Sequence, residues 1–243
     1  MRLLWQQRQD MRTIIIGDIH GCHSALLLLL ERVKPEAGRD RLVLLGDLFD
    51  RGPDSREVFR DVQQLASVFG DNFVLLLGNH EDYLLAPRLT LRQKKIWEAV
   101  GRQATVRSFD EVGERMEDSA PWLKEHCQLF WKADRFQCVH AGIMVDPPEV
   151  NDLQTLVHDH GIVLENRYNG PLTITGHIAL EKAAWFAGDR ETVVELEDDT
   201  AYRLPDIGVI CIDTGCGKGG RLTAMLIDED EYTLLSVDEQ GMP

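Results

Sequence analysis

The sequence predicts an α/β fold with two β layers flanked by helices, and three observations support this. Six short apolar runs, rich in β-branched residues, each lead into glycine or a charged loop, as central strands covered on both faces do. Helical stretches separate the first three runs, which is the pattern of a parallel sheet. The last third is β-rich and interrupted by turns, as antiparallel strands are. The six runs are TIIIGD from 13, RLVLLGD from 41, FVLLLGN from 73, FQCVHAG from 136, LTITGH from 172 and VICIDTG from 209.

The other elements follow in order along the chain. A leucine-rich stretch at 22–34 and the stretch at 54–69 predict two helices that cover the early strands. Asp54, followed three residues later by Glu57, indicates a capping box at the start of the second helix. Residues 81–130 are mostly helical in pattern, and late strands are predicted in ETVVELED, TAMLID and YTLLSV.

Length and composition bound the class of protein. The chain has 243 residues, of which 44% are hydrophobic, enough for one large core. We expect a single domain over 1–243, with a compact core at about 11–240 and residues 1–10 as an N-terminal extension before the Met-Arg pair at Met11. The net charge of −15 argues against a duplex nucleic acid partner, because binding to the phosphate backbone depends on Lys and Arg.

The cysteines and the apolar runs predict a location. Five cysteines stand at scattered positions without a Cys-x-x-Cys pair, which argues against a disulfide framework or a structural zinc site. This usage favours a reducing compartment, so we expect a cytoplasmic protein. The apolar run at 25–30 is far shorter than the ~20 residues of a membrane span, so no membrane partner is expected.

Metal-competent side chains follow the first three predicted strands. Asp18 and His20 follow the first strand in GDIHG, and Asp47 follows the second in GDLFDRGPD. Asn79 follows the third in GNHED. Ligands bind beyond the carboxyl ends of the strands in an open α/β sheet, so these side chains are expected to converge. The glycine before each motif lets the backbone turn sharply or approach closely.

Two later strands lead to histidine. His140 lies in CVHAG and His177 in TITGH. With the earlier residues they give carboxylate, amide and imidazole ligands without thiolate, a set that suits Mn, Fe, Zn or Co. Six such ligands are too many for one tetrahedral ion and suit two ions that share a bridge. Two ions about 3.5–4 Å apart are a device for phosphoester hydrolysis.

The ordered motifs resemble those of the phosphoprotein phosphatase family of calcineurin-like metallophosphoesterases. The order GDIHG, GDLFDRG, GNHE, HAG and GH extends from about Ile14 to Gly220, nearly the whole chain. The resemblance implies a metallophosphoesterase-type β-sandwich of two mixed sheets flanked by helices, in four αββα layers. The length and the RGPDS sequence are similar to those of bacterial and phage-type Ser/Thr protein phosphatases. The resemblance further implies two divalent ions, Mn²⁺ first with Fe or Zn as alternatives, held by Asp18, His20, Asp47 as the bridge, Asn79, His140 and His177.

The same resemblance implies the catalytic and substrate-binding residues. His80 is the expected general acid, paired with Asp50, and Arg51 is expected to bind the phosphoryl oxygens. A second phosphate-binding arginine is expected between the HAG and GH motifs, where Arg167 is the only arginine. The chemistry agrees with these roles, because a water between two divalent ions loses a proton readily and can attack phosphorus in line. A Ser or Thr alkoxide leaves poorly, so a proton donor helps.

The predicted function is therefore hydrolysis of phosphoesters, first of phosphorylated Ser or Thr in a protein or peptide, or of a small phosphoester. The alternative is a symmetrical dinucleoside polyphosphate hydrolase that acts on diadenosine tetraphosphate. Asp50 favours monoesters, because that branch commonly departs from Asp-Arg-Gly in the second motif. A second alternative is an inactive metal-bound scaffold or nucleotide sensor.

Two further features resemble sites but are interpreted structurally. His158 and His160 form an HDH sequence whose flanks indicate a helix end and a turn. Gly215, Gly217 and Gly220 satisfy the G-x-G-x-x-G pattern, but a predicted strand follows them, where a dinucleotide site needs a helix. We expect a glycine-rich turn there. Glu81 and Asp82 are expected to support the loop that carries His80.

Overall fold

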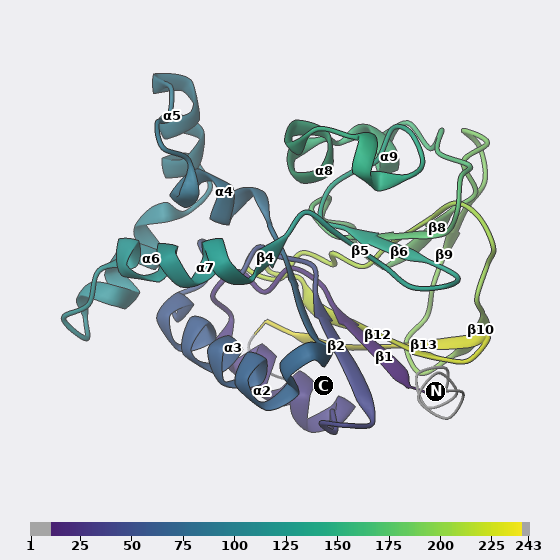
Figure 1. Cartoon of the computed structure of the whole chain (residues 1–243), viewed down its shortest axis with the longest axis horizontal. Coiled ribbons are helices and arrows are strands. Elements are labelled where there is room, and N and C mark those ends of the chain that lie inside the picture. Colours follow the sequence, from purple (N-terminus) through teal and green to yellow (C-terminus); the bar gives the residue numbers. More distant parts are fainter. Residues whose placement is uncertain (1–10, 240–243) are drawn as a thin grey trace, which may run out of the picture.

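Two mixed β-sheets form the centre of the protein in the computed structural model, which describes residues 11–239 (Figure 1). The extension predicted for residues 1–10 lies outside the described residues. The first sheet has the order β10-β13-β12-β1-β2-β3-β4, and the second has the order β5-β6-β7-β11-β8-β9. The strands of the first sheet are β1 Arg12–Ile16, β2 Asp40–Leu44, β3 Phe73–Leu76, β4 Cys127–Gln128, β10 Ala201–Arg203, β12 Arg221–Asp228 and β13 Glu231–Asp238. Those of the second are β5 Phe130–Lys132, β6 Gln137–Val139, β7 Thr173–Thr175, β8 Ala184–Phe186, β9 Val193–Glu195 and β11 Val209–Cys211.

The register of the first sheet puts the N-terminal strand in its middle. β1, β2, β3 and β4 are parallel, as the alternation of strands and helices predicts. β1 also pairs antiparallel with β12, so that Ile14 lies opposite Leu42 on one side and Leu226 on the other. The antiparallel strands predicted in the last third are confirmed by the pairing of β12 with β13 and of β13 with β10.

Alternate side chains of β1 enter different cores. Ile14 and Ile16 pack with residues of the helices on the outer face, whereas Ile15 packs in the core between the two sheets. This alternation follows from the two-residue period of a strand. Both faces are therefore covered, which explains why the early strands are continuous apolar runs.

Helices cover the outer face of each sheet. α2 and α3 lie on the first sheet, and α8 and α9 lie over the second, on the opposite side of the sandwich (Figure 1). The four-layer arrangement implied by the sequence is confirmed. α4 to α7 form the helical region predicted between 81 and 130, and α5 stands farthest from the sheets. The helices are α2 His23–Val33, α3 Ser55–Phe69, α4 Asn79–Leu85, α5 Leu91–Ala99, α6 Arg102–Asp110, α7 Ala120–His126, α8 Leu153–His158 and α9 Gly161–Leu164, with 3₁₀ turns η1 Gly70–Asn72, η2 Met116–Ser119 and η3 Pro148–Val150.

One local prediction is wrong and another is confirmed. The Asp54 side chain makes no cap hydrogen bond at the start of α3. The Ser108 hydroxyl of α6 accepts the N–H of Arg56 instead at 3.0 Å, so a tertiary contact replaces the predicted capping box. The glycine-rich segment at 215–220 forms the turn between β11 and β12, as expected. Within residues 11–239, none of the helices has the length and apolar character needed to cross a membrane.

Candidate metal centre and active site

The predicted ligands meet where strands of both sheets end. Asp18 and Asp47 follow the parallel strands β1 and β2, and Asn79 begins α4 just after β3. His140 directly follows β6, and His177 lies two residues after β7, which is parallel to β6. The site therefore lies between the two sheets and receives side chains from each.

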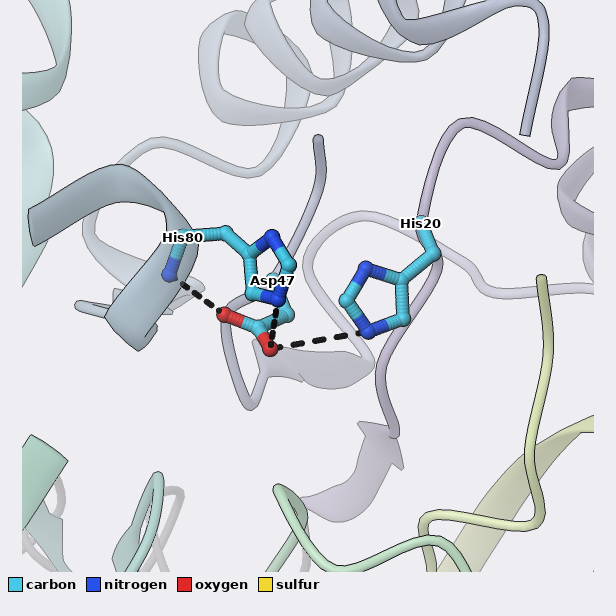
Figure 2. Close-up of side chains that lie close together, drawn as sticks. All are labelled: His20, Asp47 and His80. Atoms are coloured by element: carbon cyan, nitrogen blue, oxygen red, sulfur yellow. Dashed lines mark hydrogen bonds and ion pairs between the residues drawn. The ribbon is translucent and has the colours of Figure 1, made fainter. Parts of the chain in front are cut away.

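Asp47 is at the centre of the site. Its Oδ2 lies 3.5 Å from Nε2 of His20 and 3.8 Å from Nε2 of His80, and these three side chains form one cluster (Figure 2). Its Oδ1 lies 3.5 Å from Nε2 of His140, and His177 completes a second cluster. One buried carboxylate thus presents an oxygen to each cluster, as a ligand shared by two cations would.

Hydrogen bonds to the main chain orient two of the imidazoles. Nδ1 of His20 donates to the carbonyl of Phe49 at 2.8 Å, and Nδ1 of His140 donates to the carbonyl of Leu45 at 2.8 Å. These contacts fix the proton on Nδ1 and leave the Nε2 lone pair directed at Asp47. Such bonds commonly orient histidine ligands of metals.

Asn79 belongs to the second cluster. Its Oδ1 lies 3.1 Å from Nε2 of His140 and 2.8 Å from Nδ1 of His177. The three side chains therefore direct oxygen and nitrogen atoms at one point beside Asp47. An amide oxygen adds a ligand without adding negative charge to an already acidic site.

His80 differs from the other imidazoles in its partner. Its Nδ1 lies 2.6 Å from Oδ2 of Asp50, and both side chains are almost fully buried. Its main-chain N–H donates to Oδ1 of Asp47 at 3.0 Å. Arg51 reaches the same space, because its guanidinium contacts Nε2 of His20 and lies 3.5 Å from Nε2 of His80. The arrangement places a carboxylate-paired imidazole and a cationic fork beside Asp47.

Buried polar atoms without partners support binding of cations. Among the described residues, Asp18 Oδ1, Asp213 Oδ2 and His177 Nε2 have no hydrogen-bond partner. Burial, followed by the negative charge of Asp213, raises the pKa of Asp18 well above its usual value. A buried carboxylate oxygen is unfavourable unless it is hydrogen-bonded or coordinates a cation. The carboxylate, amide and imidazole donors of the site therefore fit divalent ions.

Burial and charge move the pKa values of the imidazoles apart. Burial lowers the pKa of His20 well below its usual value and also lowers that of His140. It brings the pKa of His177 to about 2. Burial acts in the same direction on His80, but the charge on Asp47 and the hydrogen bond to Asp50 outweigh it, so that pKa is raised. The lowered pKa values favour the neutral form of His20, His140 and His177, which can bind a cation, and the raised pKa favours the cationic form of His80.

The backbone is strained where the site residues stand. Ten non-glycine residues in the described chain have a positive φ, and five of them are predicted site residues. L-residues rarely adopt this conformation, and it persists where surrounding contacts hold it in place. The strain supports the assignment of these loops to function. The five are His20 at 48°, Asp47 at 49°, Asp50 at 72°, Arg51 at 68° and His177 at 67°.

Glu81 holds the Asp47 loop in place through its main-chain N–H groups. Its carboxylate accepts the main-chain N–H groups of Asp47 at 2.8 Å, Leu48 at 2.9 Å and Phe49 at 3.3 Å. Asp82 instead binds Nε2 of His158 at 2.8 Å. Glu81 therefore supports the neighbouring Asp47 loop, Asp82 pairs with α8, and His158 ends α8 as its flanks indicate.

The glycine-rich turn also contacts the site. A Cβ on Gly217 would lie 2.9 Å from Cβ of His20 and 3.0 Å from Cβ of Arg51, and φ at Gly217 is 77°. The close approach and the left-handed backbone both require glycine. The segment therefore packs against the site, and β12 follows it in place of the helix that a Rossmann-type motif requires.

Asp213 is a site neighbour that our sequence analysis missed. It is 1% exposed, and its Oδ1 accepts the N–H of Gly215 at 2.9 Å. A signal was present, because Asp213 follows a buried strand in VICIDTG as Asp18 follows TIII.

Arg167 lies outside the cluster. Its side chain is 54% exposed and forms an ion pair with Glu165, the one polar contact it makes within residues 11–239. The neighbouring Asn166 is buried and ties this loop to Gly188 and Thr192. The structure thus brings together nine of the ten predicted site residues, and a role for Arg167 in substrate binding stays a prediction.

A carboxylate shared by two imidazole clusters, in a sandwich of two mixed sheets, defines a metal-dependent hydrolase. The chain belongs to the calcineurin-like phosphoesterase family, whose sequence profile matches residues 11–211. It is 36% identical over 277 aligned positions to a Pseudomonas fluorescens (strain SBW25) protein named "Bis(5'-nucleosyl)-tetraphosphatase, symmetrical". That match covers 91% of this chain and 93% of the relative.

Two further matches are shorter or more distant than this one. A Nitrosomonas europaea protein of the same name is 38% identical over 138 residues, which is 55% of this chain and 46% of the relative. The chain thus matches less than half the length of that protein. The crystal structure of a metallophosphoesterase from Sphaerobacter thermophilus has a TM-score of 0.65 over 96% of this chain and 95% of its own. At 18% identity this likeness shows the fold alone.

Proposed function

We propose that this phosphoesterase hydrolyses symmetrical dinucleoside polyphosphates such as diadenosine tetraphosphate. The main support for phosphoester hydrolysis is the position of Asp47. Its two carboxylate oxygens face two imidazole clusters, next to His80, which is hydrogen-bonded to the Asp50 carboxylate. The relative that matches over 91% of this chain is named for the dinucleotide substrate, and it favours this substrate over a phosphoprotein. The substrate named as the alternative in the sequence analysis therefore becomes the first candidate.

The proposed metal ligands divide around Asp47. Asp18, whose carboxylate lies 3.9 Å from His20, would hold one divalent ion together with His20 and Asp47, and the second would be held by the same Asp47 and the second cluster. Asn79, His140 and His177 form that second cluster. The ions, with Mn²⁺ as the first candidate and Fe or Zn as others, would supply Lewis acidity toward phosphoryl oxygens and toward a nucleophilic water.

The protein's own groups have separate proposed roles. His80 holds a proton on Nε2 for the leaving oxygen, because Asp50 fixes the proton on Nδ1. The Arg51 guanidinium lies against both imidazoles of the first cluster, where its planar fork suits phosphoryl oxygens. Burial of Asp47, Asp50 and His80 strengthens the interactions among them.

Turnover of two substrates tests this proposal. Purified protein is treated with chelator, and activity is measured with Mn²⁺, Fe²⁺, Zn²⁺ or Mg²⁺ on diadenosine tetraphosphate and on a phosphoserine peptide. We expect two molecules of ADP from each dinucleotide and a higher kcat/KM than for the peptide. Release of ATP with AMP, or a clear preference for the peptide, would reject the assignment. Inactivity with metal bound would favour the scaffold or sensor alternative.

Dephosphorylation of Ser or Thr in a protein or peptide is the second candidate, and Asp50 favours it. Symmetrical cleavage of the dinucleotide releases a nucleoside diphosphate, which is a weak base and leaves readily. An alkoxide is a strong base and needs a proton as the P–O bond breaks. The buried Asp50–His80 pair supplies such a donor.

A cytoplasmic location is part of the proposal. All five cysteines are free thiols, and three of them are fully buried: Cys138, Cys211 and Cys216. This agrees with a reducing compartment. We propose no membrane or duplex nucleic acid as a partner, and the net charge of −15 agrees with this.

A further inference from the structure

The Asp50 carboxylate has more hydrogen-bond donors than its pairing with His80 requires. Its Oδ2 accepts from Nδ1 of His80 at 2.6 Å and from Nε1 of Trp97 at 2.7 Å. Its Oδ1 accepts from the hydroxyl of Thr105 at 2.7 Å. Asp50 is 0% exposed, so no water competes for these positions. The carboxylate is thus held at both oxygens in one orientation.

Thr105 also holds the main chain of Asp50. The N–H of Asp50 donates to the Thr105 hydroxyl at 2.7 Å, and Ser55 Oγ lies 3.1 Å from the same oxygen. One hydroxyl has one proton, which goes to the carboxylate, so the Ser55 hydroxyl donates to Thr105. This bridge holds residue 50 at a φ of 72°, a conformation that needs support.

Both donors come from a part of the chain outside the strand-end loops. Trp97 lies on α5 and Thr105 on α6, 47 and 55 residues beyond Asp50. Gly101 between these helices packs on the loop, because a Cβ there would lie 2.5 Å from the main-chain nitrogen of Arg51. α5 otherwise stands away from the two sheets (Figure 1). The helix pair therefore contacts the Asp50 loop directly.

We propose that Trp97 and Thr105 are positioning residues that hold the proton donor His80 in place through Asp50. The inference rests on the proposed role of His80 in phosphoester hydrolysis. A fixed carboxylate keeps the Nδ1 proton of His80 in one direction, so Nε2 faces the leaving oxygen. As the P–O bond breaks, the Nε2 proton moves to that oxygen, and the ring regains a proton from water in the next step. An imidazole free to rotate would meet the leaving oxygen in only part of its orientations.

A purely structural role would have a different signature. Trp97 also packs against Tyr83, with ring centroids 6.0 Å apart, and the Arg102 guanidinium lies 4.9 Å from its ring. Loss of packing alone would slow every substrate equally. Loss of proton donation slows only substrates whose leaving group needs the proton. Comparison of a poor and a good leaving group therefore separates the two roles.

The test uses Trp97→Phe and Thr105→Val, which keep most of the volume and remove the donor. Mn²⁺-loaded proteins hydrolyse phenyl phosphate, a poor leaving group, and 2,4-dinitrophenyl phosphate, a good one. We expect kcat on phenyl phosphate to fall about 10-fold in each variant, a part of the roughly 10²–10⁴-fold contributed by general acid catalysis. We expect less than about 3-fold change on the dinitrophenyl ester, with KM and metal content unchanged. Equal loss on both esters, or no loss on either, would overturn the proposal.

Three controls make the outcome specific. Thr105→Ser keeps the hydroxyl and is expected to restore the rate on phenyl phosphate. Trp185→Phe removes an indole donor that binds the carbonyl of Ile207 at 3.1 Å in the second sheet, and is expected to change neither rate. His80→Asn is expected to show the same selective loss on phenyl phosphate, and to a larger extent. If His80→Asn slows both esters equally, the proposed role of His80 is wrong. If His80→Asn shows the selective loss but Trp97→Phe and Thr105→Val do not, the proposed roles of Trp97 and Thr105 are wrong.

A spectroscopic measurement checks the contact without turnover. The Trp97 indole N–H signal is assigned in ¹⁵N spectra of the metal-free protein by its loss in Trp97→Phe. We expect this proton to exchange slowly with D₂O, because Trp97 is 8% exposed and hydrogen-bonded. Asp50→Asn is expected to shift the same signal. Rapid exchange together with an unchanged shift would contradict the contact.

Discussion

The loops that carry His20 and His80 lie side by side, but they shift the pKa values of their imidazoles in opposite directions. The two rings are 4.7 Å apart between centroids in a T-shaped contact, and both are buried. Their Nε2 atoms lie at similar distances from Oδ2 of Asp47, 3.5 Å for His20 and 3.8 Å for His80. Distance to the shared carboxylate therefore does not distinguish them.

The partner of Nδ1 distinguishes the two loops. His20 donates to a neutral carbonyl, that of Phe49, and its pKa is lowered mainly by burial. His80 donates to the carboxylate of Asp50, and its pKa is raised despite burial, by Asp47 and then by Asp50. A neutral dipole beside Nδ1 fits the metal ligand proposed for His20, and a charged carboxylate beside Nδ1 fits the proton donor proposed for His80. The pKa values of these two neighbouring imidazoles thus differ because their Nδ1 partners belong to consecutive residues, the carbonyl of Phe49 and the carboxylate of Asp50.

The largest expected effect follows from removal of the carboxylate that both loops share. Asp47→Asn weakens the hold on both proposed ions, which supply several kcal/mol of transition-state stabilisation, so we expect hydrolysis of p-nitrophenyl phosphate to fall by about 10³-fold or more. Bound metal per protein, measured by elemental analysis, is expected to fall with it. A variant that keeps both metal and activity would remove Asp47 from the centre of the site.

Substitution of the two histidines separates the loops. His80→Asn is expected to lower kcat on phenyl phosphate by roughly 10²–10⁴-fold with metal content unchanged, because only proton donation is lost. His20→Asn is expected to lower metal content as well, because a ligand is lost. Metal analysis and kinetics on the same samples provide the comparison. If both variants lose metal equally, the Nδ1 partner does not determine the role.

Glu81 supports the segment whose Phe49 carbonyl binds His20. Glu81→Ala leaves three main-chain N–H groups without their acceptor, and each buried unpaired donor costs about 1–3 kcal/mol. We expect the free energy of unfolding in urea to fall by at least about 2 kcal/mol. Asp82→Ala is the matched control, because it removes one partly exposed ion pair with His158 and is expected to cost less than about 1 kcal/mol. Equal losses in the two variants would contradict the support assigned to Glu81.

The pH dependence of stability should also separate the loops in metal-free protein. The lowered pKa values of His20, His140 and His177 mean that the unfolded chain binds more protons. Stability then rises with pH and is lost as the pH falls below the ordinary value of 6.5, by up to about 1.4 kcal/mol per pH unit for each imidazole.

The pKa of His80 is shifted in the opposite direction, so its contribution to the pH dependence of stability has the opposite sign. Its raised pKa contributes stability that is fully present below about 6.5 and is lost as the pH rises through the folded value. Urea unfolding from pH 5 to 9 should therefore show a shallower acid slope in His20→Asn and a shallower alkaline slope in His80→Asn. Identical profiles for the two variants would mean that the loops do not set these pKa values.

The smallest expected effect belongs to Arg167. Its exposed ion pair with Glu165 contributes less than about 1 kcal/mol, so Arg167→Ala is expected to change kcat/KM on diadenosine tetraphosphate by less than about 3-fold. If KM instead rises selectively, by about tenfold or more, the substrate-binding role predicted from sequence would be confirmed. Arg51→Ala, measured alongside, is expected to have the larger effect.

The sequence predicts the strand ends because local patterns determine them. Each early strand is a continuous apolar run into a glycine and a polar ligand, and β1, β2 and β3 confirm the order. The apolar run that predicts β3 includes Leu77, but the strand ends one residue earlier, at Leu76. Nine of the predicted site residues converge because parallel strands of both sheets end beside one another.

Contacts between distant segments were not predictable in the same way. Trp97 and Thr105 show no pattern that points to Asp50, because helix periodicity explains each of them equally well as core residues. The Asp54 and Glu57 pair has the spacing of a capping box, but Ser108 from α6 takes the N–H of Arg56. Contacts with distant segments determine which hydrogen bonds form there, whereas a sequence pattern describes only contacts between residues close in the chain.

The pairing of β1 with β12 has a consequence for synthesis of the protein on the ribosome. β1 and β2 emerge early, but the N–H of Gly17 beside Asp18 donates to the carbonyl of Thr223 in β12. Gly217, which packs against His20, also emerges late. A nascent chain that ends before β12 therefore has an open strand edge next to Asp18 and an incomplete wall at His20. We expect such chains to retain no metal, so that the hydrolytic centre forms only when synthesis has reached β12.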